Sequence, residues 1–490
     1  MQRPPRFSWL YRQPLWLLAA LACLGCASPT RHKVDLPATD TPDVWQENFE
    51  PGAAGPPSDL GAWWLRFADP PLASLVERSL DGNTDVRQAS AALEQAIALR
   101  DVAAAGLSAT LGYSASAQSN FNGDGNATNN LQAGFNAGWN PDLFGVQHRA
   151  LDASNANLQA ALAHWGSVQA SVASGVALNY IVLRSNQARV GIAQQNLISQ
   201  QDTLQIAQWR NQAGLIGAIE VEQALVAAQQ TSAQLPPLEQ AIARTLHALA
   251  VQTGRPPAAL SEGLAVPAPV PLAPANLQLM SPAATLLARP DVQAAQYQVT
   301  RAIADVNQAR ARRYPTLNLG ANLGVGAASL AALSSSAALM AGVAVSLVGP
   351  LFDGGALQAQ IRAAKAVLLQ SSSFYRGIQL TALQEVEDAL VSLRTDRARA
   401  EQLQGVVAAA ERAAAMARQR FASGLVDFQI VLETQRSQLS AQDIKAQADA
   451  NVSSDQVRLY TALGGGWKPG SARLNDVRIA PQTAALLSTP

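Results

Sequence analysis

Three polar side chains near the C-terminal end of the chain have a spacing that would let them act together. Gln429, Glu433 and Arg436 stand at positions i, i+4 and i+7, which places them on one face of a helix. An amide, a carboxylate and a guanidinium on one face can interact with ions or polar solutes without covalent chemistry. The alternative is that Glu433 and Arg436 form an ordinary solvated helix pair, worth under about 1 kcal/mol.

Residue groupings that would support catalysis are not found in the sequence. There is no HExxH or Cys/His cluster to hold a metal, and the four histidines lie far apart, at His32, His148, His164 and His247. There is no G-x-S-x-G elbow and no P-loop. The glycines of residues 320–329 follow a strand pattern rather than opening a helix, so nucleotide binding is not indicated. The sequence therefore predicts no enzyme and no metal.

The N-terminus carries a candidate lipidation site. Arg3, Arg6 and Arg12 precede an apolar run at 15–24 that is too short to span a membrane as a helix. The run ends at Gly25-Cys26, which resembles a bacterial lipoprotein signal. Residues 1–25 would then be removed, and Cys26 would carry a diacylglycerol and an N-acyl chain, with Cys23 as the alternative. If Cys26 is the only cysteine of the mature chain, no disulfide framework can form.

Bulk composition excludes one class of partner. The 490 residues have a formal net charge of zero, so a basic surface for nucleic acid is not indicated. Only 14% of residues are charged and 5% are aromatic. Long helices with small residues at their contacts would give such a composition.

The elements that would position these residues occur twice in the chain. RQRFASGLVDFQIVLETQ (418–435) aligns with QWRNQAGLIGAIEVEQAL (208–225), which pairs Gly424 with Gly214 and Leu425 with Leu215. Further landmarks recur in the same order, which indicates two copies of one unit. The predicted parts are a signal peptide (1–25), a Pro-rich arm (26–69), a first repeat (70–254), a Pro-rich connector (255–280), a second repeat (281–464) and a C-terminal tail (465–490).

Each copy is predicted to contain a helix, a β-hairpin and a long αα-hairpin. The first helices cover 72–106 and 283–313. Alternation of apolar and polar residues predicts β-hairpins at 107–140 and 316–348, with strands at 107–118, 131–140, 316–325 and 339–347. Proline-free helical patterns follow at 145–212 and 353–422, each about 100 Å long if fully helical. Return helices follow at 217–253 and 427–463, with tips at Gly214 and Gly424.

The strand pattern fits either a half-buried soluble hairpin or a membrane hairpin with its apolar face toward lipid. Four such strands beside a lipoprotein signal favour the membrane interpretation, in which Tyr113 and Trp139 would suit an interfacial position. Four strands cannot close a barrel, and open edges are not tolerated in lipid. The chain must therefore oligomerise, and a trimer would supply twelve strands. Loops 119–130 and 326–338 would then face outside.

With these parts in place, the sequence resembles the TolC-like outer membrane efflux family, in its lipoprotein branch of the OprM and NodT type. Besides Cys26 and the Gly-Leu tips, the motifs that carry the resemblance are WWLRFADPPLASLVERSL (63–80), NPDLFG (140–145), GPLFDGG (349–355), LETQR (432–436) and LGGGW (463–467). The resemblance implies a membrane α+β fold. It would be a homotrimer whose 12-stranded transmembrane β-barrel, with four strands per chain, continues into a long periplasmic α-helical coiled-coil barrel.

The same resemblance implies the function and the partners. The chain would be the exit duct of a tripartite efflux system in the bacterial outer membrane, anchored by its lipid and conducting small molecules or drugs. Its partners would be a periplasmic adaptor, an inner-membrane pump of the RND type and outer membrane lipids. The alternatives are the outer membrane component of a type I protein-secretion system, or a lipid-anchored coiled-coil protein with no channel.

Residue roles also follow from the resemblance. Glu433 falls on the carboxylate that lines the periplasmic entrance, with Arg436 and Gln429 as its neighbours in a periplasmic gate. Phe421 and Val426 replace more polar residues of relatives, so we expect more apolar packing in the closed state. The adaptor-docking tips would be Gly214, Leu215, Gly424 and Leu425, whereas Glu385, Glu387 and Asp388 are expected to be solvated helix positions.

Overall fold

The computed structural model describes residues 41–47, 59–121, 127–260, 262–274, 277–329, 331–335 and 338–467. The predicted signal peptide and Cys26 lie outside these residues, as does most of the C-terminal tail. The chain forms two compact units, and each draws on both halves of the sequence. We call them the strand unit, which includes 95–159 and 297–374, and the helical unit, which includes 39–94, 160–296 and 375–490.

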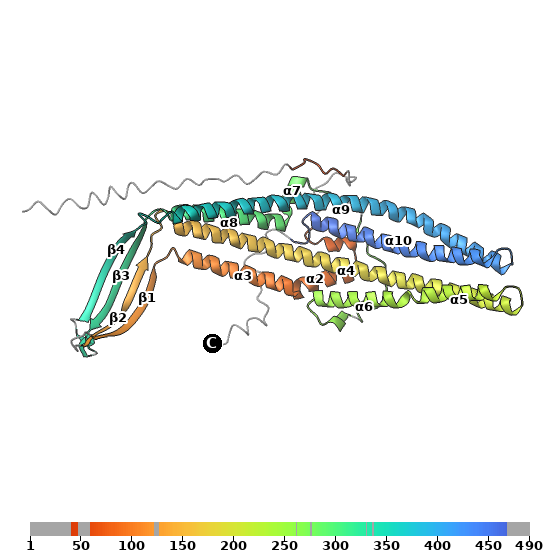
Figure 1. The fold of residues 1–490 in the computed structure, drawn as a ribbon, viewed down its shortest axis with the longest axis horizontal. Helices are drawn as coiled ribbons and strands as arrows, with labels where there is room; N and C mark the ends of the chain where they lie inside the picture. The colour runs from red at the N-terminus through yellow and green to blue at the C-terminus, as the bar shows by residue number, and fades with distance from the viewer. Residues whose placement is uncertain are drawn as a thin grey trace, which may run out of the picture. The chain divides into compact units, whose positions relative to one another are not determined.

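The strand unit is built around one four-stranded antiparallel sheet in the order β1-β2-β3-β4 (Figure 1). The strands are β1 (Thr110–Phe121), β2 (Ala127–Trp139), β3 (Thr316–Ala327) and β4 (Leu339–Val348). The pairing of β2 with β3 joins the hairpin of the first copy to that of the second. The first hairpin extends further into the expected loop than predicted, with Phe121 opposite Ala127. Ladder hydrogen bonds use only the backbone, so polar residues continue the strands after the apolar alternation ends.

Helices supply the rest of both units. The first copy contributes η1 (Trp63–Phe67), α2 (Pro70–Gly82), α3 (Thr84–Ala105), α4 (Val146–Gln212), α5 (Ala218–Ser232), α6 (Leu235–Gln252) and η2 (Pro257–Leu260). The second contributes α7 (Pro282–Ala288), α8 (Pro290–Ala311), η3 (Ala331–Ser334), α9 (Ala356–Ala422) and α10 (Phe428–Ala462). Figure 1 shows α10 running back beside α9.

Three helices that the periodicity predicts as continuous are each broken in two. Asn83 is extended between α2 and α3, and its side chain caps α3 by accepting from the amide of Asp85 at 2.7 Å. Arg289 is extended because the next residue, Pro290, disfavours a helical conformation there. The predicted 217–253 helix is divided before α6, which has proline in its first turn.

In both copies, the residue at the break between the first two helices donates a side-chain hydrogen bond to the end of the return helix. The Nδ2 of Asn83 donates to the carbonyl of Gln252 at the end of α6, at 3.0 Å. At the corresponding place in the second copy, Nη1 of Arg289 donates to the carbonyl of Ala462 at the end of α10, at 2.9 Å. The helix break therefore docks onto the end of the return helix in both halves.

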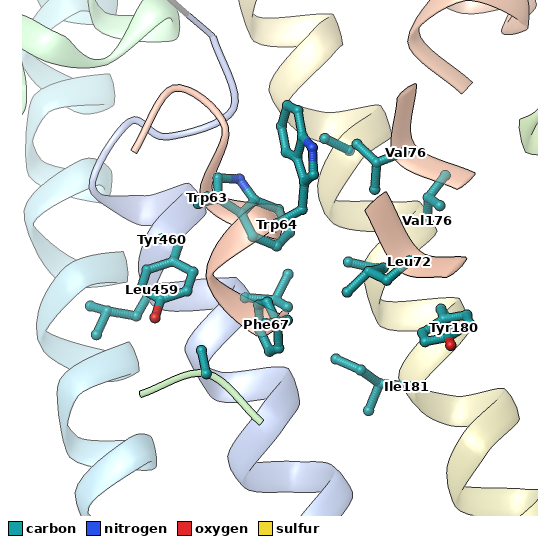
Figure 2. Packing of buried hydrophobic residues seen from close by; sticks show 14 of the residues in the cluster. Trp63, Trp64, Phe67, Leu72, Val76, Val176, Tyr180, Ile181, Leu459 and Tyr460 are labelled. Carbon is teal, nitrogen blue, oxygen red and sulfur yellow. The ribbon is translucent and has the colours of Figure 1, made fainter. Parts of the chain in front are cut away.

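The main core of the helical unit surrounds η1. Trp63, Trp64 and Phe67 are buried between Tyr460 on α10 and Tyr180 on α4 (Figure 2). The ring centroids of Trp63 and Tyr460 are 5.9 Å apart. The Tyr180 hydroxyl donates to the Asp69 carboxylate at 3.0 Å, and burial raises the pKa of Tyr180 to about 12. The WWLRF sequence is therefore the aromatic centre that joins the first and second repeats within the helical unit.

Two carboxylates that we expected to be simply solvated are structural. Glu387 accepts the backbone amides of Gln46 and Glu47 at 2.8 and 3.3 Å, which ties the N-terminal arm to α9. Glu385 forms a 2.7 Å ion pair with the buried Arg289. Glu385 and Asp388 are exposed, as expected, and Glu387 is partly buried. The sequence did not predict the partners of Glu385 and Glu387, because these partners lie far away along the chain.

Candidate functional site

The sheet separates its side chains into an apolar and a polar face. The register places Tyr113 opposite Phe135, and Phe135 opposite Leu323, so the apolar positions of neighbouring strands share one face. Tyr113 is 87% exposed, and Val343 is similarly exposed on the same face. An apolar sheet face of this kind is suited to lipid contact.

On β1, β2 and β3 the opposite face carries serine, threonine, asparagine, glutamine and glycine, whereas on β4 it also carries Met340, Ala344 and Val348. On this face Nδ2 of Asn136 donates to Oγ of Ser114 across β1 and β2, at 2.8 Å. Asn322 on β3 pairs with Asn136 in the ladder and continues the polar row. The sheet thus has the two-faced character of a barrel wall that contacts lipid on one side and water on the other.

The predicted gate residues lie on the exposed face of α10, close to its N-terminal end. Gln429, Glu433 and Arg436 are exposed, whereas Val431 and Leu432 pack into a small apolar core. Gln429 Nε2 donates to Gln223 Oε1 on α5 at 2.7 Å. Among the described residues, no ion pair joins Glu433 to Arg436. The two charges are therefore presented to solvent on this helix face.

The two tips are built alike. Gly214 and Gly424 have φ angles of 72° and 73°, a left-handed conformation that glycine adopts without strain. The amide of Leu215 donates to the carbonyl of Arg210 at 2.8 Å, and that of Leu425 donates to Arg420 at 2.9 Å. These bonds close the C-terminal ends of α4 and α9. Leu215 and Leu425 are 67% and 73% exposed, so each tip presents an apolar side chain that its turn does not use.

Arg210 is a tip residue that sequence reasoning missed. Its guanidinium lies 4.6 Å from the ring centroid of Phe421, and its Nη1 donates to the Phe421 carbonyl. Phe421 also packs against Phe428, with ring centroids 5.3 Å apart. In the sequence, Arg210 is only a landmark of the repeat aligned with Arg420. The long-range contact joins the tips of the two helical hairpins.

The fold and these surfaces agree with what the chain matches among known proteins. The sequence model described as Outer membrane efflux protein matches residues 75–255 and again 282–465. The chain therefore belongs to the outer membrane efflux protein family, as its motifs predicted. It is an outer membrane efflux channel protein, and the predicted location in the outer membrane is confirmed.

Particular relatives cover nearly the whole chain. The pyoverdine export outer membrane protein OpmQ of Pseudomonas putida is 32% identical over 469 residues, which is 92% of this chain and 97% of OpmQ. Nodulation protein T of Rhizobium leguminosarum is 28% identical over 86% of this chain and 88% of its own length. The outer-membrane channel OprN is 32% identical with a TM-score of 0.80, covering 89% of this chain and 100% of the OprN chain. VceC of Vibrio cholerae is 26% identical with a TM-score of 0.76, over 84% of this chain and 100% of VceC. The predicted fold class is thereby confirmed.

Proposed function

We propose that three copies of this chain form the exit duct of a tripartite efflux system. The observation that carries this proposal is the sheet with one apolar and one polar face. In the described chain, β1 and β4 each pair on one side only. Open strand edges are not tolerated in lipid, and three four-stranded sheets supply the twelve strands of a closed barrel.

The duct works with a periplasmic adaptor and an inner-membrane pump of the RND type, and its cargo is small organic molecules. Support comes from relatives that are named for solvent efflux and toluene efflux, which are 29% identical to this chain over 416 residues. The exposed Leu215 and Leu425 at the tips supply an apolar surface for the adaptor. The covalent lipid on Cys26 adds an anchor beside the barrel.

Glu433 is the main gate residue in this proposal, with Gln429 and Arg436 as neighbours on the same face of α10. Three-fold symmetry would bring three Glu433 carboxylates toward one axis, where they repel each other unless a cation or Arg436 compensates their charge. The Arg210–Phe421 contact and the Gln429–Gln223 hydrogen bond would hold the tips while the duct is closed.

The test is single-channel recording of the full-length protein in planar bilayers, on preparations that run as heat-sensitive trimers. Glu433→Ala should raise conductance and weaken block by divalent cations. Glu401→Ala removes another exposed carboxylate, on α9, and should leave both properties unchanged. Wild-type conductance together with wild-type cation block in Glu433→Ala would mean that Glu433 does not line the constriction.

A further inference from the structure

A cluster of arginines lies at the junction between α8 and the sheet. Arg310, Arg312 and Arg313 are all exposed, and β3 begins at Thr316, three residues after the last of them. The junction is ordered, since the amides of Arg313 and Tyr314 donate to the carbonyls of Arg310 and Ala311. Three cationic side chains are thereby held next to the start of a membrane strand.

No carboxylate of the described strand unit compensates these arginines. Its acidic side chains are already engaged with other groups. Asp101 pairs with Arg100, Asp142 with His148, Asp152 with Arg149 and Asp305 with Arg301, while Asp353 accepts the backbone amides of Gly355 and Leu357. Within the described residues, Arg310, Arg312 and Arg313 form no ion pair.

Aromatic side chains lie at the same end of the sheet as the arginines. The rings of Tyr314 and Phe144 stack with centroids 5.0 Å apart and an interplanar angle of 12°, and both remain partly open to the surroundings. Trp139, the last residue of β2, is also exposed, and its indole Nε1 donates to the Leu107 carbonyl at 3.2 Å. Aromatic side chains of this kind are enriched at the boundary between lipid tails and water.

The first copy shows that the junction does not need arginines. A shift of 206 residues carries the end of α3 at Ala105 onto the end of α8 at Ala311, and Thr110 of β1 onto Thr316 of β3. The same shift places Ala104, Gly106 and Leu107 opposite the three arginines. The first copy therefore makes the same helix-to-strand connection with uncharged residues at these three positions. The arginines are not needed to form the connection, so they have another role.

We propose that Arg310, Arg312 and Arg313 bind the phosphate groups of anionic phospholipids in the leaflet that faces the periplasm. This inference rests on the proposed barrel, whose apolar face would contact the acyl chains. A planar guanidinium donates two parallel hydrogen bonds to one phosphate, which gives a firmer contact than a point charge. The adjacent apolar strands and aromatic rings favour a phospholipid over free phosphate, because one molecule can then contact both surfaces.

The experiment compares lipid retention by the wild-type protein and two triple variants. Full-length trimers are extracted from vesicles of equal phosphatidylglycerol and phosphatidylcholine content, and the bound lipids are counted by native mass spectrometry. The wild type should retain phosphatidylglycerol several-fold over phosphatidylcholine. R310Q/R312Q/R313Q should bring the ratio close to one. R376Q/R399Q/R412Q removes the same charge from exposed positions of α9 and should keep the wild-type ratio.

Three outcomes would overturn the proposal. They are an unchanged ratio in R310Q/R312Q/R313Q, an equal loss in R376Q/R399Q/R412Q, and complete displacement of the lipid by inorganic phosphate at millimolar concentration. Conductance in pure phosphatidylcholine bilayers separates this inference from the proposed duct. A wild-type protein that forms channels there but shows no lipid preference contradicts only the arginine site, whereas failure to form channels contradicts the duct.

Discussion

At the scale of single residues, the helical unit places an acidic side chain in an unusual environment. The side chain of Asp455 on α10 is 2% exposed, and its Oδ1 accepts from Arg458 at 2.9 Å, whereas Oδ2 is buried without a hydrogen-bond partner. Burial raises the pKa of Asp455, and the Asp396 carboxylate of α9 raises it further, while Arg458 opposes both effects. The folded protein therefore holds a proton more tightly at Asp455 than the unfolded chain does.

This raised pKa predicts that the protein loses stability as the pH rises. A proton bound by the folded state and released by the unfolded chain stabilises the fold at low pH, and that stability is lost as the pH rises through the folded pKa. Asp455→Asn resembles the protonated carboxyl and should flatten the fall of the thermal unfolding midpoint as the pH rises above 3.8, the ordinary pKa of an aspartate. Asp202→Asn, at an exposed site, should keep the wild-type slope.

Arg289 supports a second prediction, for which Asn83, at the matching helix break of the first repeat, is the control. Its guanidinium bonds Asp291 and Glu385 at 2.7 Å, and these carboxylates raise its pKa although burial lowers it. Arg289→Met leaves both carboxylates without their cation and should destabilise the protein by roughly 2–3 kcal/mol, because Asp291 and Glu385 stay partly solvated. Asn83→Ala, which removes neutral hydrogen bonds at the matching position, should cost about 1 kcal/mol. Equal midpoints of thermal unfolding for the two variants would contradict this ranking.

At the scale of elements, the tips separate a structural role from a docking role. Gly214 and Gly424 are needed for their positive φ, and nothing lies within 4 Å of a Cβ built on Gly214. Alanine at either position should cost about 1–2 kcal/mol through backbone strain. Leu215 and Leu425 are not needed by the turns. Leu215→Asp with Leu425→Asp should therefore abolish crosslinking to the adaptor while heat-sensitive trimers still form. Loss of the trimers would instead show that these leucines are structural.

The strands and long helices could be predicted from the sequence because their patterns are local. Apolar alternation locates all four strands, and the absence of proline locates α4 and α9. The break at Asn83 was harder to predict because its side chain bonds the distant carbonyl of Gln252, whereas Pro290 and the prolines that open α6 are local signals for the other two breaks. The spacing of Gln429, Glu433 and Arg436 predicts a shared face, but no local pattern predicts that Arg210 lies over Phe421. A contact between residues so far apart in the sequence can be recognised only once the packing of the two tips is known.

At the scale of the whole molecule, the lipid on Cys26 and the barrel would be two independent attachments to the membrane. Cys26→Ser should stop labelling by radioactive fatty acid, as should treatment with globomycin. Channel conductance should persist, because the strands hold the protein in the bilayer. If the label persists in Cys26→Ser and disappears only in Cys23→Ser, then Cys23 is the lipidated cysteine and the assignment to Cys26 is wrong.

The unpaired edges of the sheet have a consequence for the assembly of the chain before it enters the membrane. In the described sheet, β1 and β4 each leave one row of backbone amides and carbonyls without a neighbouring strand. Until sister chains cover those rows, any extended polypeptide can add to them, and crowding favours that error. We therefore expect a newly exported chain to depend on a holding chaperone in the periplasm, and the yield of folded trimer to depend on the rate at which the chain meets two further copies. Slow synthesis should then give less protease-resistant product per chain made than fast synthesis does, as long as chaperone capacity is not exceeded.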